Sequence, residues 1–155
     1  MYTAQDILNE KGIEMIHTHP ESTVADALKT MLEKKIGAIV IKDGEDIVGI
    51  WTERDLMRNV VTEGFFSKTS KIKDYMSTDL KLAKHDDTIL ALQDKFLGKR
   101  IRHLFIEKDG KILGIISTGD VIKAIINEKT KEFEQLHAIV KFDYYEDWKF
   151  KRKKR

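Results

Sequence analysis

Two segments of this sequence repeat one another, which restricts the fold to architectures built from two similar units. Residues 23–58 align with residues 88–123 without a gap, at a constant offset of 65, and nine of the 36 positions are identical. A copy of about 50 residues buries too little surface to be stable alone. The repeat therefore predicts two units that pack together and share a core.

The first copy has the apolar pattern of a helix, two strands and a second helix. Thr23, with Asp26 three residues later, resembles a capping box at the start of the first helix. The segments 36–41 and 47–51 are rich in β-branched residues and flank a polar turn at 42–46, so they are predicted strands. The apolar stripes expected on the two helices are Val24, Ala27, Leu28, Met31 and Leu32 on the first, and Leu56, Val60 and Val61 on the second.

The second copy repeats this order, with predicted strands at 104–106 and 112–116. A further short strand is expected before each copy, near residues 15–17 and 80–83. We therefore predict an α+β fold of two βαββα repeats related by a pseudo-twofold axis. Its remaining helix stripes are Ile89, Leu92, Phe96 and Leu97, and Val121, Ile122, Ile125 and Ile126.

The predicted division of the chain is repeat 1 at 10–66, repeat 2 at 67–127, and a C-terminal helix with a basic tail at 128–155. The apolar positions Phe133, Leu136, Ile139 and Val140 favour an amphipathic extension of the last helix. Such a helix packs either on a partner subunit or on its own body. The following stretch, 142–150, has five aromatic residues and no clear period.

Composition excludes several classes of protein. The chain contains no cysteine, which excludes a disulfide scaffold and a thiolate metal site. Its first residues lack the regions of a signal peptide, and no apolar run approaches the roughly 20 residues of a membrane helix. We therefore expect a cytoplasmic protein that does not enter a membrane.

The net charge of +2 is unevenly distributed. The tail 149–155 has six basic residues and no acidic one, and the rest of the chain has 22 basic against 26 acidic residues. Such a tail can attract the phosphates of a nucleic acid, or it can be a solvated terminus. Nearby aromatic residues could stack on bases or anchor the tail to the protein: Tyr144, Tyr145, Trp148 and Phe150.

A short polar motif recurs at the end of the second long strand of each copy. It has a glycine, two apolar residues, a hydroxyl residue and, three positions later, an aspartate. A hydroxyl at a strand-to-helix junction lies beside free backbone N–H groups, which favour anions. An aspartate one turn later can accept hydrogen bonds from two neighbouring hydroxyls, such as those of a ribose. The same spacing is also that of a capping box that only starts a helix. The motif residues are Gly49, Thr52 and Asp55, and Gly114, Ser117 and Asp120.

The repeated motif and the βαββα order resemble the CBS domain family, over roughly residues 10–127. A tandem pair of this kind resembles a Bateman module. The resemblance implies a regulatory module whose cleft between the repeats binds an adenosine ligand, such as AMP, ADP, ATP, S-adenosylmethionine or NAD(H). It also implies a homodimer, and a signal that passes through a change of shape or assembly to another protein. The residues it implicates are Thr52 and Ser117 near ribose or phosphate, and Asp55 and Asp120 on ribose hydroxyls.

Further site residues are candidates for phosphate and adenine. Arg102 and His103 precede a strand, at positions where AMP-binding members of the family often have basic residues; alternatively they form a solvated strand edge. The matching residues of the first copy, Gly37 and Ala38, are uncharged, so the two sites are expected to differ. Arg54 is another phosphate candidate. The adenine-pocket candidates implied by the resemblance are Met15, Ile16, Leu80 and Leu82.

Other functions have weaker support in the sequence. His17 and His19 share one face of a predicted strand, but no third metal ligand is evident. No nucleophile–base pairing or nucleotide-binding glycine motif is present, so we expect no enzyme activity, no metal and no cofactor beyond a regulatory adenine nucleotide. The alternatives to ligand sensing are a ligand-free dimerisation scaffold and a nucleic-acid-binding protein that uses the tail.

Overall fold

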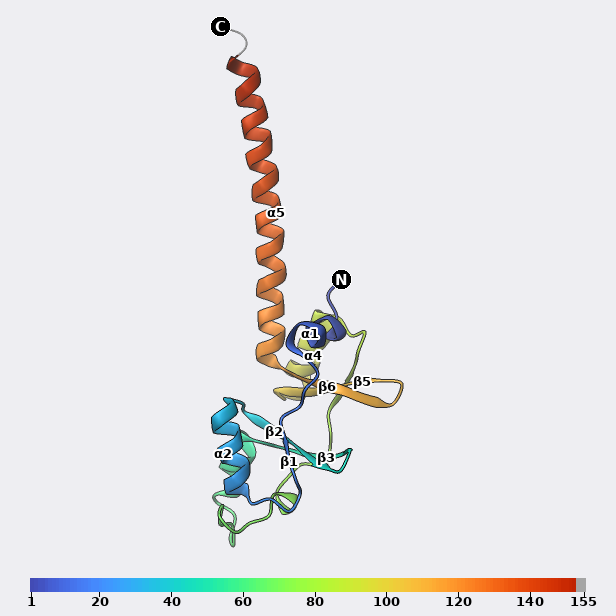
Figure 1. The fold of residues 1–155 in the computed structure, drawn as a ribbon, viewed down its shortest axis with the longest axis vertical. Helices are drawn as coiled ribbons and strands as arrows, with labels where there is room; N and C mark the ends of the chain where they lie inside the picture. Colours follow the sequence, from blue (N-terminus) through green and yellow to red (C-terminus); the bar gives the residue numbers. More distant parts are fainter. Residues whose placement is uncertain (153–155) are drawn as a thin grey trace.

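The computed structural model describes residues 1–152 of the chain, and side chains through residue 138. It contains two similar halves, each with a three-stranded sheet, and one long helix that leaves the body (Figure 1). The elements of the first half are β1 (His17–Thr18), α2 (Val24–Lys34), β2 (Ala38–Asp43), β3 (Asp46–Thr52), α3 (Glu53–Asn59) and the 3-10 helix η1 (Ile72–Asp74).

The second half repeats the first. Its elements are β4 (Leu82–Lys84), α4 (Ile89–Lys99), β5 (His103–Lys108), β6 (Lys111–Ser117) and α5 (Thr118–Arg152). In both halves the short strand pairs in parallel with the middle strand, and the middle strand pairs antiparallel with the last strand. This order confirms the predicted fold of two βαββα repeats with a helical extension.

Local chemistry explains where the first helix of each half begins and ends. The Thr23 hydroxyl accepts a hydrogen bond from the backbone N–H of Asp26 at 3.2 Å, and the Thr88 hydroxyl accepts one from Ala91 at 3.3 Å. These bonds satisfy an N–H group that the helix itself cannot. Both helices stop at a residue in the left-handed conformation, Lys35 and Arg100. Thr23 thus forms the hydroxyl half of the predicted capping box.

An N-terminal helix, α1 (Ala4–Lys11), is absent from the elements that the sequence predicts. Its buried residues Ala4, Ile7 and Leu8 belong to the core of the second half, although the strand that follows α1 belongs to the first half. In the same way, Ile72 and Met76 precede the second half but pack on the core of the first. Each half is therefore completed by the segment that leads into the other one.

The glycine of each repeated motif allows this close packing. A Cβ atom on Gly49 would lie 2.5 Å from the Met76 sulfur and 3.0 Å from the Ser77 carbonyl oxygen. A Cβ atom on Gly114 would lie 2.9 Å from Leu8 Cδ2. Only glycine fits at both positions without movement of the crossing segments.

Some predicted apolar stripes are wrong at their margins. α3 ends at Asn59, so Val60 and Val61 follow the helix and are exposed rather than buried. The buried side of each helix is narrow, and the flanking apolar positions face solvent. These exposed residues are Leu32, Leu97, Ile122 and Ile126.

Among the residues whose side chains the structure describes, α5 packs into the body through its first turns. Val121 and Ala124 lie in the core of the second half, whereas Phe133 and Leu136 are exposed. Figure 1 shows the rest of the helix extending away from both sheets. One of the two predicted alternatives, in which Phe133 and Leu136 pack on the body of the same chain, is therefore wrong.

The helical backbone continues to Arg152, so the aromatic stretch 142–150 without a clear period is helical. The side chains of residues 139–155, including the basic tail 149–155 and its aromatic neighbours, lie outside the described part of the chain. No helix in that described part is long and apolar enough to cross a membrane.

Candidate ligand-binding sites in the two halves

Each repeated motif lies where the last strand of a sheet passes into a helix. Thr52 ends β3 and Ser117 ends β6. Thr52 pairs across the sheet with Ala38, and Ser117 pairs with His103. We call Thr52 and Asp55 the first site, and Ser117 and Asp120 the second site.

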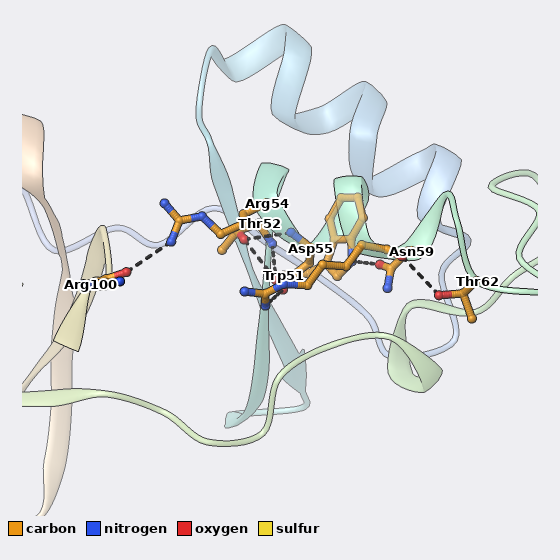
Figure 2. Close-up of polar contacts among 8 residues, drawn as sticks. Trp51, Thr52, Arg54, Asp55, Asn59, Thr62 and Arg100 are labelled. Carbon is orange, nitrogen blue, oxygen red and sulfur yellow. Dashed lines mark hydrogen bonds and ion pairs between the residues drawn. The ribbon is translucent and has the colours of Figure 1, made fainter.

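At the first site, the hydroxyl and the aspartate form a closed capping box (Figure 2). Asp55 Oδ2 accepts hydrogen bonds from the Thr52 backbone N–H at 2.9 Å and from its hydroxyl at 3.0 Å. The Asp55 backbone N–H donates to the Thr52 hydroxyl at 3.3 Å. The other carboxylate oxygen, Oδ1, lies 3.6 Å from the exposed Arg58 guanidinium. The cap thus occupies one oxygen of Asp55 and turns the other away from it.

The second site has the same geometry and one additional partner. Asp120 Oδ2 accepts hydrogen bonds from the Ser117 backbone N–H at 2.7 Å and from its hydroxyl at 2.9 Å. The ammonium of Lys11, from α1, lies 2.6 Å from the same oxygen. Among the described residues, no hydrogen bond reaches Asp120 Oδ1.

The surroundings keep Asp120 ionised. Burial alone would raise the pKa of this carboxyl, but hydrogen bonds from Lys11 and Ser117 outweigh burial and hold the pKa below its usual range. An ionised carboxylate with a free oxygen is a strong acceptor for ligand hydroxyls.

His103 is neutral at physiological pH. Burial lowers its pKa to about 4, and the nearby charges of Lys11 and Arg102 act in the same direction against the opposing charge of Asp120. The imidazole of His103 is therefore uncharged, and the positive charges that lower its pKa are those of Lys11 and Arg102.

We expect His103 to titrate near pH 4, against about 6.5 for an unperturbed histidine. Because the folded pKa lies below the unfolded one, His103's stabilising contribution is complete above pH 6.5 and is lost between about 6.5 and 4. An NMR pH titration of the imidazole signals, assigned with a His103→Gln variant, measures this. A midpoint near 6.5 would contradict the burial of the ring.

Two further phosphate candidates have different surroundings. Arg102 is exposed, and its carbonyl oxygen accepts a hydrogen bond from the Thr118 backbone N–H at 3.0 Å. Arg54 extends from α3 to the other half, where its guanidinium donates to the Arg100 carbonyl oxygen at 3.1 Å (Figure 2). Arg54 thus joins the two halves beside the first site.

The adenine candidates lie beside the two sites, in the segments that contain the short strands β1 and β4. β1 pairs His17 with Val40, so Met15 lies level with Ala38, the partner of Thr52. The corresponding strand β4 brings Leu80 level with His103. Met15, Ile16 and Leu80 are partly buried, while Leu82 is exposed. Their role in holding adenine stays a prediction.

Lys11 is a site residue that the repeat pattern does not reveal. It lies outside the aligned copies, and only the crossing of α1 to the second half brings it to Asp120. It also contributes to a pocket of about 160 Å³ between α1 and α5. The pocket is lined by Ile7, Glu10, Lys11, Asp120, Lys123, Ala124 and Asn127.

His17 and His19 are both exposed and make separate local contacts. His17 Nδ1 lies 3.1 Å from the Met15 carbonyl oxygen, and His19 Nδ1 accepts a hydrogen bond from Glu21. Within residues 1–138, no three histidine, aspartate or glutamate side chains gather in a metal-binding cluster.

The CBS domain family model matches this chain twice, at residues 3–62 and 72–127. The chain belongs to the CBS domain family. The CBS domain-containing protein CBSX3, mitochondrial, of Arabidopsis thaliana is 32% identical over 92% of this chain and 73% of its own length. This relative confirms the family that the repeated motif predicts.

Solved structures have the same fold. The CBS-domain containing protein ATU1752 from Agrobacterium tumefaciens is 34% identical, with a TM-score of 0.74 over 79% of this CBS pair and 92% of that chain. CBSX2, solved in complex with AMP, has a TM-score of 0.66 over 83% of this chain and 98% of its own. The sequence of CBSX2 is 22% identical to this chain, so this similarity shows a shared fold alone.

Proposed function

We propose that this CBS pair is a regulatory module that binds an adenosine-containing ligand between its repeats, without turning it over. The observation that carries the proposal is the geometry of the two aspartates. In each, Oδ2 accepts the hydrogen bonds of the helix cap, and none of these bonds reaches Oδ1. Oδ1 can then accept hydrogen bonds from the ribose hydroxyls while the helix start stays intact. The AMP complex of CBSX2 shows that a protein of this fold binds such a ligand.

The remaining candidate residues would contact the adenine and the phosphate of the ligand. Met15, Ile16, Leu80 and Leu82 would contact the adenine through backbone and apolar groups, and Arg54, Arg102 and the neutral His103 would contact a phosphate. We propose AMP, ADP or ATP as the ligand class, with S-adenosylmethionine and NAD(H) as the other adenosine compounds to test.

The size of the pocket beside Asp120 suggests how binding produces a signal. Its volume of about 160 Å³ is smaller than the roughly 300 Å³ of the smallest typical ligand pockets. A nucleotide that enters this pocket would therefore favour a more open arrangement of α1 and α5. A ligand that binds one arrangement better shifts the population toward it, and an unidentified protein partner could read that shift. The cytoplasmic location also stays part of this proposal.

Thermal unfolding of the nucleotide-stripped protein tests the ligand class. At 100 times its dissociation constant, a bound ligand stabilises the folded protein by about 2.7 kcal/mol, which should raise the melting temperature by roughly 5–11 °C for a chain of this size. We expect this rise with an adenosine compound but not with GMP or inorganic phosphate. No rise with any adenosine compound would favour the ligand-free scaffold, and salt-dependent binding of nucleic acid that disappears without residues 149–155 would favour the tail hypothesis.

Self-association is the second part of the proposal. Exposed apolar residues recur at the 65-residue offset in both halves, and we propose that they form a pseudo-twofold apolar surface. A second copy of the chain matches such a surface about a twofold axis, and exposed apolar patches of this kind mark interfaces. The recurring pairs are Leu32 and Leu97, Met57 and Ile122, and Val61 and Ile126.

α5 extends this surface beyond the body. Ile122, Ile126, Phe133 and Leu136 lie on one face of the helix at spacings of four, seven and three residues, and all four are exposed. A helix that projects into water gains most of its stability from packing, so this face favours a partner helix from the second copy.

We expect Phe133→Glu with Leu136→Glu to weaken the dimer by at least about 100-fold, because four apolar side chains per dimer are replaced by charges. Sedimentation equilibrium measures the dissociation constant. Lys131→Glu, on the opposite face of α5, is the matched control and should leave it nearly unchanged. An unaltered dimer in the double variant would contradict the proposed role of α5.

A further inference from the structure

Lys11 is held at the second site by the packing of its own helix. It is the last residue of α1, and Ile7 and Leu8 of the same helix are buried in the core of the second half. The side chains of Lys11 and Asp120 are 31% and 24% exposed, so their ion pair is only partly accessible to water. Removing bulk water strengthens a pair of charges relative to one on the surface.

The ion pair leaves hydrogen-bonding capacity on both partners. Lys11 contacts Asp120 Oδ2, the oxygen that the Ser117 cap already uses, and Oδ1 stays free of hydrogen bonds from the described residues. An ammonium has three donors, and only one is directed at Asp120. A ligand can therefore meet a free carboxylate oxygen and two free ammonium donors at adjacent points.

These two groups match two adjacent parts of a nucleoside monophosphate, the ribose and the 5′-phosphate. The carboxylate suits the ribose hydroxyls, and the ammonium suits the 5′-phosphate. Because Lys11 neutralises Asp120, the carboxylate does not repel the phosphate. The flexible lysine stem lets the ammonium contact both Asp120 and a phosphate beside it.

The first site lacks this arrangement among its described contacts. The cation near Asp55 is Arg58, which is 71% exposed and 3.6 Å away. The thioether of Met76 packs over Gly49, as Leu8 packs over Gly114, and no lysine is among the described contacts of Asp55. Lys11 is therefore a chemical difference between two sites that are otherwise built alike.

We infer that Lys11 makes the second site selective for phosphorylated over unphosphorylated adenosine, by contacting the 5′-phosphate while Asp120 holds the ribose. This inference rests on the proposed function. It assigns a ligand contact to the N-terminal helix, outside the aligned repeats.

Lys11→Met tests the inference, because it removes the ammonium and keeps a long, unbranched side chain. The measurement is calorimetric titration of the full chain with AMP and with adenosine, in an Asp55→Asn background that isolates the second site. A hydrogen bond to a charged group corresponds to at least about tenfold in affinity. We expect AMP to bind at least about tenfold more weakly to Lys11→Met, and adenosine to bind within about twofold of the background protein.

Two further variants control for charge and folding. Lys11→Arg keeps the charge and should retain most of the preference for AMP, and Lys34→Met, at an exposed position of α2, should change neither affinity. Unchanged AMP binding in a folded Lys11→Met would overturn the inference, and so would an equal loss for AMP and adenosine, since Lys11 would then act only through Asp120. Tighter binding of both would also overturn it, because Lys11 would then be a competitor for Asp120. If the unaltered chain binds neither compound, the proposed function fails as well.

Discussion

Asp120→Asn is expected to weaken AMP binding at the second site by roughly 10- to 100-fold. The substitution removes the charge from the oxygen that we propose accepts the ribose hydroxyls, and a hydrogen bond to a charged group contributes about 1.5–3 kcal/mol. The helix cap should suffer much less, because the asparagine side-chain oxygen can still accept from Ser117. Calorimetric titration gives the affinity, and urea unfolding gives the stability.

The N-terminal helix offers a matched control for this experiment. Thr3 and Asp6 form the same closed capping box, with Asp6 Oδ2 accepting from the Thr3 backbone N–H at 2.8 Å, but they lie outside the repeated motif. Asp6→Asn should lower stability by no more than about 1 kcal/mol and leave AMP binding unchanged. Asp55→Asn reports on the first site in the same way. If Asp55→Asn and Asp120→Asn bind AMP as the unaltered chain does, the aspartates are only caps and the scaffold alternative gains.

Trp51→Ala is expected to lower the free energy of unfolding by about 3–5 kcal/mol, the usual cost of deleting a buried aromatic side chain. Trp51 is fully buried in the core of the first half. Its indole N–H donates to Asn59 Oδ1 at 2.9 Å, which ties β3 to the end of α3 (Figure 2). The substitution therefore opens a cavity and leaves the Asn59 side chain without this partner.

The second half supplies a comparison for Trp51. Ile116 occupies the equivalent position and is also fully buried, so Trp51→Ile should cost less than Trp51→Ala because it leaves a smaller cavity. Leu90→Ala, at an exposed position of α4, should change stability by less than about 0.5 kcal/mol. Urea unfolding of all three variants at one protein concentration tests the order, because self-association also affects stability. A loss below about 1 kcal/mol for Trp51→Ala would contradict the packing of the first core.

The order of elements could be predicted because both copies of the repeat have the same pattern. Strand periodicity, the polar turns and the motif glycines agree in both copies, and the structure confirms the resulting fold. The position of each motif at a strand-to-helix junction could be predicted for the same reason, since Thr52 and Ser117 end strands and cap helices.

The contacts between distant segments could not be predicted in this way. The start of α1 does have local signals, a capping box at Thr3 and Asp6 and apolar residues at Ile7 and Leu8. Nothing local indicates, however, that α1 packs on the second half rather than the first, because that choice depends on how the chain crosses between the halves. The ion pair between Lys11 and Asp120 depends on this crossing, so the repeat pattern could not predict it.

Calorimetric titration of the unaltered, nucleotide-stripped protein with AMP, and with GMP as the control, tests the central claim most directly. The account predicts saturable binding of AMP at micromolar concentrations, at one or two sites per chain, and weak or no binding of GMP. Absence of saturable AMP binding by folded protein, or equal binding of GMP, would contradict an adenosine site built on the repeated hydroxyl–aspartate motif.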